Sequence, residues 1–380
     1  MKQNFRIHLI LFGLPWLLFA QTEMPESSPL GKVYMGCVVQ NWRLEKQKPV
    51  VNQISFPIIL NEPIGEHFVL RIIHSPAQTK WDTAKITGLS DTWIQGTYLF
   101  PSRKAMLHFG LGMPTGKTRL TNSEYELAKH ISTNFLRYQV PVYGQGFCAQ
   151  MGGALAFELT QNVVLGIGAQ YVAHGSYHPV RFTYQYDQIQ KVFDEPYRPG
   201  NELIGQVGVD ILINEETKCI VDGEVARYER DVLAGKEVYK AGERATFGLG
   251  LYRRFQSQYL WAYAVYRMKK RPLFVQGLSS EEAQKNQEGP QLELDFVYKA
   301  VAFREGGFFL LGEGRYYQHE KGSASPGGTL IGGGIGVQFQ IFEGALADLR
   351  AKFFGGTFRG NITQQILGMD FRAGLSFVLL

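Results

Sequence analysis

The sequence has few charged residues, few cysteines and almost no long apolar runs. Three cysteines in 380 residues exclude a disulfide-stapled scaffold. Charged residues make up 19% of the chain, and 39 basic against 34 acidic side chains give a net charge of only +5, which argues against a nucleic-acid binder. Beyond the N-terminus there is no run of about 18 apolar residues, so a helical membrane protein is unexpected.

Aromatic residues and glycine are abundant instead. The chain has 26 Phe, 19 Tyr, 5 Trp and 43 Gly. Disordered chains are poor in aromatics and carry high net charge, so this composition excludes disorder. What remains is a large β-rich protein, which is either a soluble sandwich or barrel or a membrane barrel.

The N-terminus has the pattern of a secretory signal peptide over residues 1–20. Lys2 and Arg6 form a basic region, Ile7–Phe19 is an apolar stretch too short to span a bilayer, and Ala20 offers a small residue for cleavage. We expect export, a short periplasmic tail over residues 21–32 and one barrel domain over residues 33–380. The cysteines lie in strand-like runs and are interpreted as packing residues; they are Cys37, Cys148 and Cys219.

Apolar and polar residues alternate with period 2 along much of the chain, which predicts strands with two different faces. Near the C-terminus, for example, Leu349, Ala351 and Phe353 alternate with Asp348, Arg350 and Lys352. These runs exceed the five or six residues usual in globular sheets and suit tilted membrane-spanning strands. Sixteen strands are predicted, with starts near residues 33, 49, 66, 91, 104, 146, 162, 203, 217, 243, 258, 290, 307, 328, 344 and 366.

The connections between these strands alternate between short and long. Short turns are predicted at Asn61–Gly65, Pro101–Lys104, Thr160–Asn162, Asn214–Thr217, Gln256–Gln258, Arg304–Gly307 and Phe342–Gly344. Longer connections are predicted at Pro76–Ser90, Pro114–Gln145, His174–Glu202, Arg230–Gly242, Lys269–Gly289, Lys321–Gly327 and Gly355–Gln365. Tight periplasmic turns and longer outer loops are typical of an antiparallel outer-membrane β-barrel. Sixteen strands are expected, or fourteen if the first hairpin, with its short loop Glu45–Lys48, does not form.

In such a barrel the apolar face contacts lipid and the polar face lines the lumen. Charges of both signs recur on the predicted lumen face, often two residues apart. They are Asp210, Asp222, Glu224, Glu293, Asp295, Glu313, Arg315, Asp348, Arg350, Lys352, Asp370 and Arg372. They are interpreted either as a charged pore lining or as ion pairs that brace the wall. Aromatic residues near strand ends fit either interfacial girdles or strand packing; they are Trp93, Tyr98, Phe100, Tyr259, Trp261, Tyr316 and Tyr317.

Motifs of catalysis and cofactor binding are incomplete. Gly112–Thr118 approaches a phosphate-binding loop, but Leu111 stands where its first glycine is required. His174 and His178 share a predicted loop with Asp187, which is weak support for a metal site. We therefore expect no catalytic residues, no metal and no cofactor. A barrel enzyme is kept as a further hypothesis, because catalytic residues that come together only in space at the rim leave no linear motif.

Two stretches carry a resemblance to a known family. Asp91–Tyr98 and Leu107–Gly116 resemble outer-membrane proteins of the phenol-degradation meta-pathway type, which are similar in turn to fatty-acid transporter barrels. The resemblance covers these two stretches only and implies a passive channel for small hydrophobic compounds. Residues 21–32 are too short for the N-terminal plug of the fatty-acid transporters.

The C-terminal strand alternates Phe371, Ala373, Leu375, Phe377 and Leu379, as a strand read by the outer-membrane assembly machinery does, although the chain runs on to Leu380. The expected partners are outer-membrane lipid, this machinery and an unidentified small solute, with no nucleic acid. Two functions are carried forward: a passive channel whose long loops, such as Pro114–Gln145, fold over the mouth, and a structural or scaffold barrel with a closed lumen.

Overall fold

A computed structural model describes most of the chain. The described residues are 31–45, 47–132, 135–186, 189–270, 272–274, 288–303, 306–319, 327–359 and 363–379. The predicted signal peptide and most of the predicted tail lie outside them. The first strand begins at Gly31, within the segment expected to be a tail.

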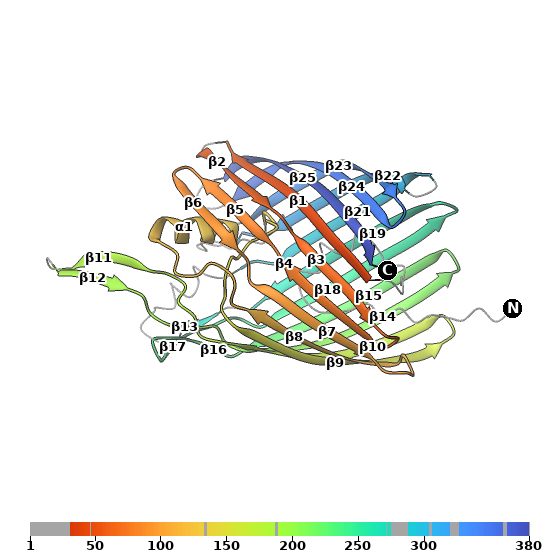
Figure 1. Cartoon of the computed structure of the whole chain (residues 1–380), viewed down its shortest axis with the longest axis horizontal. Helices are drawn as coiled ribbons and strands as arrows, with labels where there is room; N and C mark the ends of the chain where they lie inside the picture. Colours follow the sequence, from red (N-terminus) through yellow and green to blue (C-terminus); the bar gives the residue numbers. More distant parts are fainter. Residues whose placement is uncertain are drawn as a thin grey trace.

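The chain forms one closed antiparallel barrel of sixteen strands (Figure 1). In order around the wall they are β1 (Gly31–Leu44), β2 with β3 (Gln47–Ser55, Ile58–Ile64), β5 with β4 (Pro76–Trp81, Phe68–His74), β6 with β7 (Ala84–Leu89, Thr92–Leu99), β8 (Ala105–Met113), β9 (Cys148–Thr160), β10 (Val163–His174), β14 (Glu202–Asn214), β15 (Thr217–Tyr228), β18 (Arg244–Phe255), β19 (Gln258–Lys269), β21 (Gln291–Phe303), β22 (Gly306–Tyr317), β23 (Gly327–Phe342), β24 (Ala345–Arg359) and β25 (Thr363–Leu379). The seam between β1 and β25 runs from Gly31↔Leu379 to Leu44↔Ile366 and closes the sheet.

Three neighbouring wall strands are interrupted at one level. The breaks fall at Phe56–Pro57, at Ser75 and at Ser90–Asp91. Proline has no backbone N–H, so a ladder bond is missing at Pro57. The chain compensates because the Phe56 N–H donates to the Pro76 carbonyl at 2.8 Å and the Pro57 carbonyl accepts from Gly36 at 2.9 Å.

Beyond these breaks the wall continues where a loop was expected. The prediction of a long connection at Pro76–Ser90 was wrong, because this segment forms the hairpin β5–β6 around Asp82 and Thr83. The prediction at Gly355–Gln365 was also too long, since β24 reaches Arg359 and β25 begins at Thr363. The first hairpin does form, with Leu44 paired to Gln47, so the count of sixteen is confirmed over fourteen.

The wall has an apolar outer face and a polar inner face. On β23 the outward Ile331 and Ile335 are 69% and 67% exposed, while the inward Leu330 is buried. The same alternation makes Leu294 and Phe296 exposed on β21 and Glu293 buried. A belt of exposed apolar side chains on a closed sheet is the surface that a bilayer requires. The barrel therefore spans a membrane with its strands.

Among the residues that the structure describes, no helix is both long and apolar enough to cross a bilayer.

The two rims of the barrel differ, as the connection lengths predicted. Tight turns join β9 to β10, β14 to β15 and β18 to β19 at one rim, and Gly344 takes φ +80° in the turn from β23 to β24. The other rim carries the long connections, at the left in Figure 1. They contain α1 (Asn122–Ile131), β11 (Phe182–Tyr186), β12 (Ile189–Phe193), β13 (Tyr197–Arg198), β16 (Arg230–Leu233), β17 (Lys236–Lys240) and β20 (Leu273–Phe274).

The two-faced wall predicts that the same substitution has different effects on stability at adjacent positions. Val207→Arg places a charge on the lipid side, and we expect it to lower the free energy of unfolding by roughly 2–4 kcal/mol if the position lies near the bilayer midplane. Gln206→Arg is the control at the same depth on the inner side, where Gln206 already bonds to Glu224, and it should be nearly neutral. Urea unfolding in vesicles measures both, and equal losses would contradict the assignment of faces.

Candidate functional site in the barrel interior

The segment between β8 and β9, described at residues 114–132 and 135–147, folds into the barrel and is called the inner segment below. It contains α1, whose first turn is closed by a capping box: the Thr121 hydroxyl accepts from the Glu124 N–H, and the Glu124 carboxylate accepts from the Thr121 N–H. Lys117 holds the same carboxylate. Burial alone would raise the pKa of Glu124, but these donors lower it below its usual value. The prediction that Pro114–Gln145 folds over the mouth is corrected, because residues 137–140 bond to the inner wall within the lumen.

The inner segment buries its apolar side chains against the inner wall. Leu127 and Ile131 of α1, together with Phe135 and Tyr138, are fully buried or nearly so. They join one cluster with inward residues of the first and last wall strands, namely Trp42, Val51, Ala77, Ile86, Leu330, Phe354 and Ile366. Burial of a large apolar side chain contributes about 1.5–3 kcal/mol. These side chains together form a hydrophobic core inside the barrel.

Two wall glutamines bind the backbone of the inner segment. The Gln53 amide donates to the Val140 carbonyl and accepts from the Val140 N–H, both at 2.8 Å. Gln40 does the same one step earlier, accepting from the Gln139 N–H at 2.6 Å and donating to the Arg137 carbonyl at 2.9 Å. A side-chain amide carries the same donor and acceptor as a peptide group. These glutamines therefore pair with the inner segment as a neighbouring strand would.

A single carboxylate ties the two ends of the inner segment together. Asp91 accepts from the Gly116 N–H at 2.8 Å and from the Gln145 N–H at 2.6 Å. Gly116 sits so close to the other end that an added Cβ would lie 2.1 Å from the Tyr143 carbonyl oxygen. Asp91 and Gly116 are the first and last residues of the two stretches that carried the family resemblance, so that pattern coincides with the base of the inner segment.

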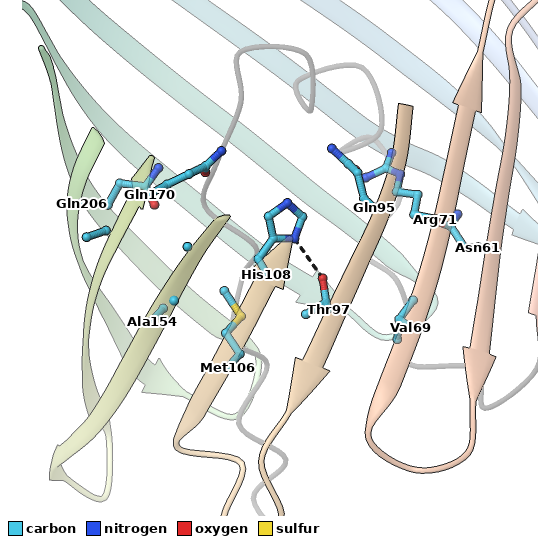
Figure 2. Close-up of a pocket in the computed structure, with 13 residues that line it drawn as sticks. Asn61, Val69, Arg71, Gln95, Thr97, Met106, His108, Ala154, Gln170 and Gln206 are labelled. Carbon is cyan, nitrogen blue, oxygen red and sulfur yellow. Dashed lines mark hydrogen bonds between the residues drawn. The ribbon is translucent and has the colours of Figure 1, made fainter. Parts of the chain in front are cut away.

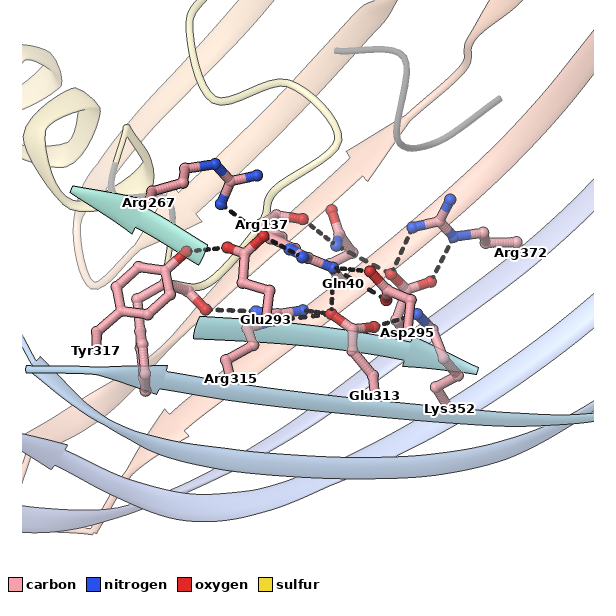
Figure 3. A network of polar contacts seen from close by, with 12 residues as sticks. Gln40, Arg137, Arg267, Glu293, Asp295, Glu313, Arg315, Tyr317, Lys352 and Arg372 are labelled. Atoms are coloured by element: carbon pink, nitrogen blue, oxygen red, sulfur yellow. Dashed lines mark hydrogen bonds and ion pairs between the residues drawn. The ribbon is translucent and has the colours of Figure 1, made fainter. Parts of the chain in front are cut away.

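Arg137 is the centre of a buried charge network (Figure 3). Its guanidinium binds Glu293, Asp295 at 3.2 Å and Glu313 at 2.8 Å. Burial alone would lower the pKa of Arg137, but these carboxylates raise it well above its usual value. Arg137 also has φ +48°, a conformation that costs a non-glycine residue about 1 kcal/mol. The ion pairs hold the backbone in this strained turn.

The structure brings seven of the twelve predicted residues together around this network. Arg315 and Lys352 bind Glu313 at 2.5 Å, and Arg372 binds Asp370 at 2.8 Å. Asp370 also accepts from Gln40 at 3.1 Å, which connects the seven. The group consists of Glu293, Asp295, Glu313, Arg315, Lys352, Asp370 and Arg372. Glu313–Arg315 and Asp370–Arg372 are pairs of charges two residues apart within one strand, whereas Lys352 of β24 reaches Glu313 of β22.

The other five predicted residues form separate pairs on the inner face. Asp348 binds Arg350 at 2.8 Å on β24. Asp210 of β14 binds Lys218 of β15 at 2.6 Å. Glu224 of β15 binds Arg244 of β18 at 2.9 Å. Asp222 accepts from the Tyr263 hydroxyl at 2.7 Å. These contacts favour bracing of the wall at each position, and a role in lining an open pore stays a proposal.

Sequence reasoning missed several members of the network. Arg137 and Arg267 both bind Glu293, and the Tyr317 hydroxyl donates to it. The inward positions of the alternating strands could have revealed Arg267, but Arg137 lies in a segment without periodicity. Tyr317 does not belong to an interfacial girdle, because it is only 4% exposed and faces inward. Tyr316, its neighbour, is 46% exposed on the outer face.

A second part of the inner wall is lined by amide, hydroxyl and small side chains (Figure 2). It encloses a cavity of about 90 Å³ on β3, β4, β7, β8, β9, β10 and β14. Its lining is Asn61, Val69, Arg71, Gln95, Thr97, Met106, His108, Gly152, Gly153, Ala154, Ala169, Gln170 and Gln206. Arg71 is the single charged side chain in this lining.

The weak metal hypothesis gains no support within the described residues. His174 lies 3.3 Å from Glu202, and His178 lies 2.7 Å from Asp194, so the two histidines have different partners. No cluster of three or more metal-ligating side chains occurs in the described part of the chain, and Asp187 lies outside it.

No protein-family model matches the chain, and no curated protein matches it. Among solved structures, a bacterial polysaccharide outer membrane secretin is 10% identical, covers 93% of this chain and 99% of its own, and has a TM-score of 0.47. A triple mutant of the Rhodopseudomonas blastica porin is 11% identical, with coverages of 92% and 100% and a TM-score of 0.38. Likenesses this distant leave the resemblance to phenol-degradation barrels unconfirmed. The assignment as a membrane barrel rests on the chain's own two-faced wall.

Removal of the Arg137 side chain should release the inner segment. Arg137→Ala leaves Asp295 without an ion-pair partner among the described residues, and a buried charge left unpaired in this way costs roughly 3–5 kcal/mol. Glu293 keeps Arg267, and Glu313 keeps Arg315 and Lys352. We expect faster cleavage by trypsin within residues 114–147 while the barrel remains folded. Lys129→Ala is the control, because its pair with Glu126 is exposed. Equal protection of both variants would show that the apolar contacts alone hold the segment.

Acid should loosen α1 in two steps. Burial against Trp81, with ring centroids 4.2 Å apart, lowers the pKa of His130, and Lys129 adds to this while Glu126 opposes it. Since docking favours neutral His130, docking weakens as pH falls below about 6.5, the value of the free side chain. The contribution of Glu124, whose pKa is lowered, is lost further below 4.5. The Trp81 fluorescence, taken as the difference from Trp81→Phe, should follow the first step, and His130→Gln should abolish it.

Proposed function

We propose that this chain is an outer-membrane channel that lets small solutes pass passively through a polar lumen. The support comes from the uneven filling of the barrel. The inner segment covers the charged inner faces of β21–β25 and the first wall strands, where Arg137 and the two glutamines hold it. The inner faces from β7 to β14 retain hydrogen-bonding side chains that line a cavity.

The observation that carries the proposal is the chemistry of that uncovered wall. Gln95, Thr97, Gln170 and Gln206 present amides and a hydroxyl, while glycine and alanine keep neighbouring positions small. Beneath α1, where the inner segment covers the wall, apolar side chains fill the inner face. A wall of small and hydrogen-bonding groups can instead replace the water of a passing solute.

Single-channel recording with a matched pair of tryptophan variants tests this function. Ala154 lines the cavity, whereas Leu155 is 46% exposed on the outer face of the same strand. We expect Ala154→Trp to lower the conductance at least twofold because the ring occupies the lumen, and Leu155→Trp to leave it unchanged. Uptake of neutral sugars into vesicles should fall in parallel.

A silent barrel that is folded and heat-modifiable would overturn the channel and favour the scaffold alternative. Equal conductance of the two tryptophan variants would place the ion path elsewhere in the lumen.

A second candidate, passage of hydrophobic compounds, is favoured by an aromatic patch on the inner face. Tyr259 lies 6.0 Å from Tyr252 and 6.3 Å from Phe309 between ring centroids, and Trp261 stacks on Tyr263 at 5.5 Å. Tyr259 and Trp261 pack on the buried cluster that contains Phe309, so their rings face inward rather than forming a girdle. Quenching of Trp261 fluorescence by 2-naphthol, as an added arm of the uptake assay, distinguishes this candidate from purely polar transport.

A further inference from the structure

Arg71 lies on the inner wall without a partner for its charge. Within the described residues, no carboxylate oxygen lies within ion-pair distance of its guanidinium and no protein acceptor takes a hydrogen bond from it; its Nε is buried and unpaired. The network residues Arg137, Arg315 and Arg372, by contrast, each bind at least one carboxylate. A cation taken partly out of water without compensation is costly, which makes the absence of a partner informative.

Neutral donors flank Arg71 on both neighbouring strands. In the sheet register Asn61 on β3 and Gln95 on β7 stand directly opposite Arg71, so the three side chains share the inner face. Figure 2 shows these three side chains at the wall of the cavity. Neither amide makes a side-chain hydrogen bond to another described residue. One charge and two free amides therefore meet at one place.

Thr97, on β7 like Gln95, adds a hydroxyl that residues of β8 and β9 orient as a donor. The Gln150 amide nitrogen lies 2.8 Å from His108 Nε2, which must then accept, so Nδ1 carries the proton and donates to the Thr97 hydroxyl oxygen at 3.1 Å. Gln170 in turn donates to Gln150 at 3.0 Å. With its oxygen occupied by His108, the Thr97 hydroxyl has its own hydrogen available for the cavity.

The carboxylate that the lining residue Gln206 contacts is already neutralised. Gln206 contacts Glu224 at 3.1 Å, and Arg244 binds that carboxylate at 2.9 Å. Glu224 therefore leaves the positive charge of Arg71 uncompensated. A guanidinium with amide and hydroxyl donors beside it fits an oxyanion, because it binds two oxygens of a carboxylate or phosphate bidentately.

We propose that Arg71, Asn61, Gln95 and Thr97 form a binding site for the oxyanion group, carboxylate or phosphate, of a small solute inside the barrel. As a statement about transport it rests on the proposed channel function, because the site would then lie on the solute path. As a statement about binding it stands on the geometry alone. The two can therefore fail separately.

Channel block tests the site with inorganic phosphate and glutarate as probes. We expect either anion to reduce the chloride current of the natural chain saturably. Arg71→Gln should raise the half-blocking concentration roughly tenfold or more, which is the loss expected for a charge-assisted hydrogen-bond pair. Arg350→Gln is the control, because it removes one inner-face charge that Asp348 already pairs. Arg71→Lys should restore charge but only part of the block, since it cannot bind bidentately.

The outcomes separate the two proposals. Block that is equal in the natural chain and Arg71→Gln, or lost equally in Arg71→Gln and Arg350→Gln, overturns the site and leaves the channel standing. Block by one probe only supports the site and identifies its class of oxyanion. If the folded barrel conducts no current, the midpoint of its thermal unfolding decides: phosphate should raise it over chloride at equal ionic strength in the natural chain and not in Arg71→Gln. No such difference overturns the site.

Discussion

The demand of a lipid environment that every backbone polar group be paired determines this architecture. An open sheet would present an unpaired edge to hydrocarbon, so the first and last strands must meet. The seam between β1 and β25 meets that demand along the full length of β1. The same demand explains how the chain compensates the breaks in the wall near Pro57 and Ser75. There the Phe56 N–H and the Pro57 carbonyl find partners on adjacent strands instead of remaining exposed.

Closure produces an enclosed polar space, and that space has to be either filled or hydrated. The inner segment fills one side of it by two devices. Gln40 and Gln53 supply the hydrogen bonds that a neighbouring strand would give to an isolated backbone. Arg137 pairs with three inward carboxylates and is the ion-pair partner of Asp295, while Glu293 and Glu313 have further cations from the wall. The glutamine hydrogen bonds and the Arg137 ion pairs both fix the inner segment against the wall. Together they explain why the strained φ of Arg137 persists.

Much of the wall could be predicted from the sequence because a strand in a two-faced sheet records its surroundings every second residue. The alternation in β23 and β24 placed both strands, and the short turn Phe342–Gly344 located the junction between them. The hairpin β5–β6 escaped because α1 and the inner segment cover its inward side, so Ala77 and Ile86 are apolar where a lumen residue would be polar. In this hairpin the alternation is inverted, because the exposed residues Lys80, Lys85 and Thr87 lie on the face opposite Ile86.

The interior was less predictable for a related reason. The carboxylates Glu293 and Glu313 follow from periodicity, but their partner does not, because the inner segment is irregular and its position depends on contacts distant in sequence. From the sequence, Gln40 and Gln53 can be predicted only as inward polar residues. Nothing in their local sequence distinguishes an amide that binds backbone from one that faces water.

The contrast between the two halves of the interior bears on where solutes would interact. Around Arg137 each charge has an opposite charge within reach, so the network gains little from a solute and would lose its own contacts by binding one. At Arg71 the situation is reversed, because a cation and free amides face the cavity with their bonding capacity unused. Other buried side-chain atoms also lack a hydrogen-bond partner, but Arg71 is a charged group without an ion pair among the described residues, and such a group calls for an explanation. Here a passing oxyanion satisfies the same groups that the protein leaves open, whereas further ion pairs of the Arg137 kind would close them.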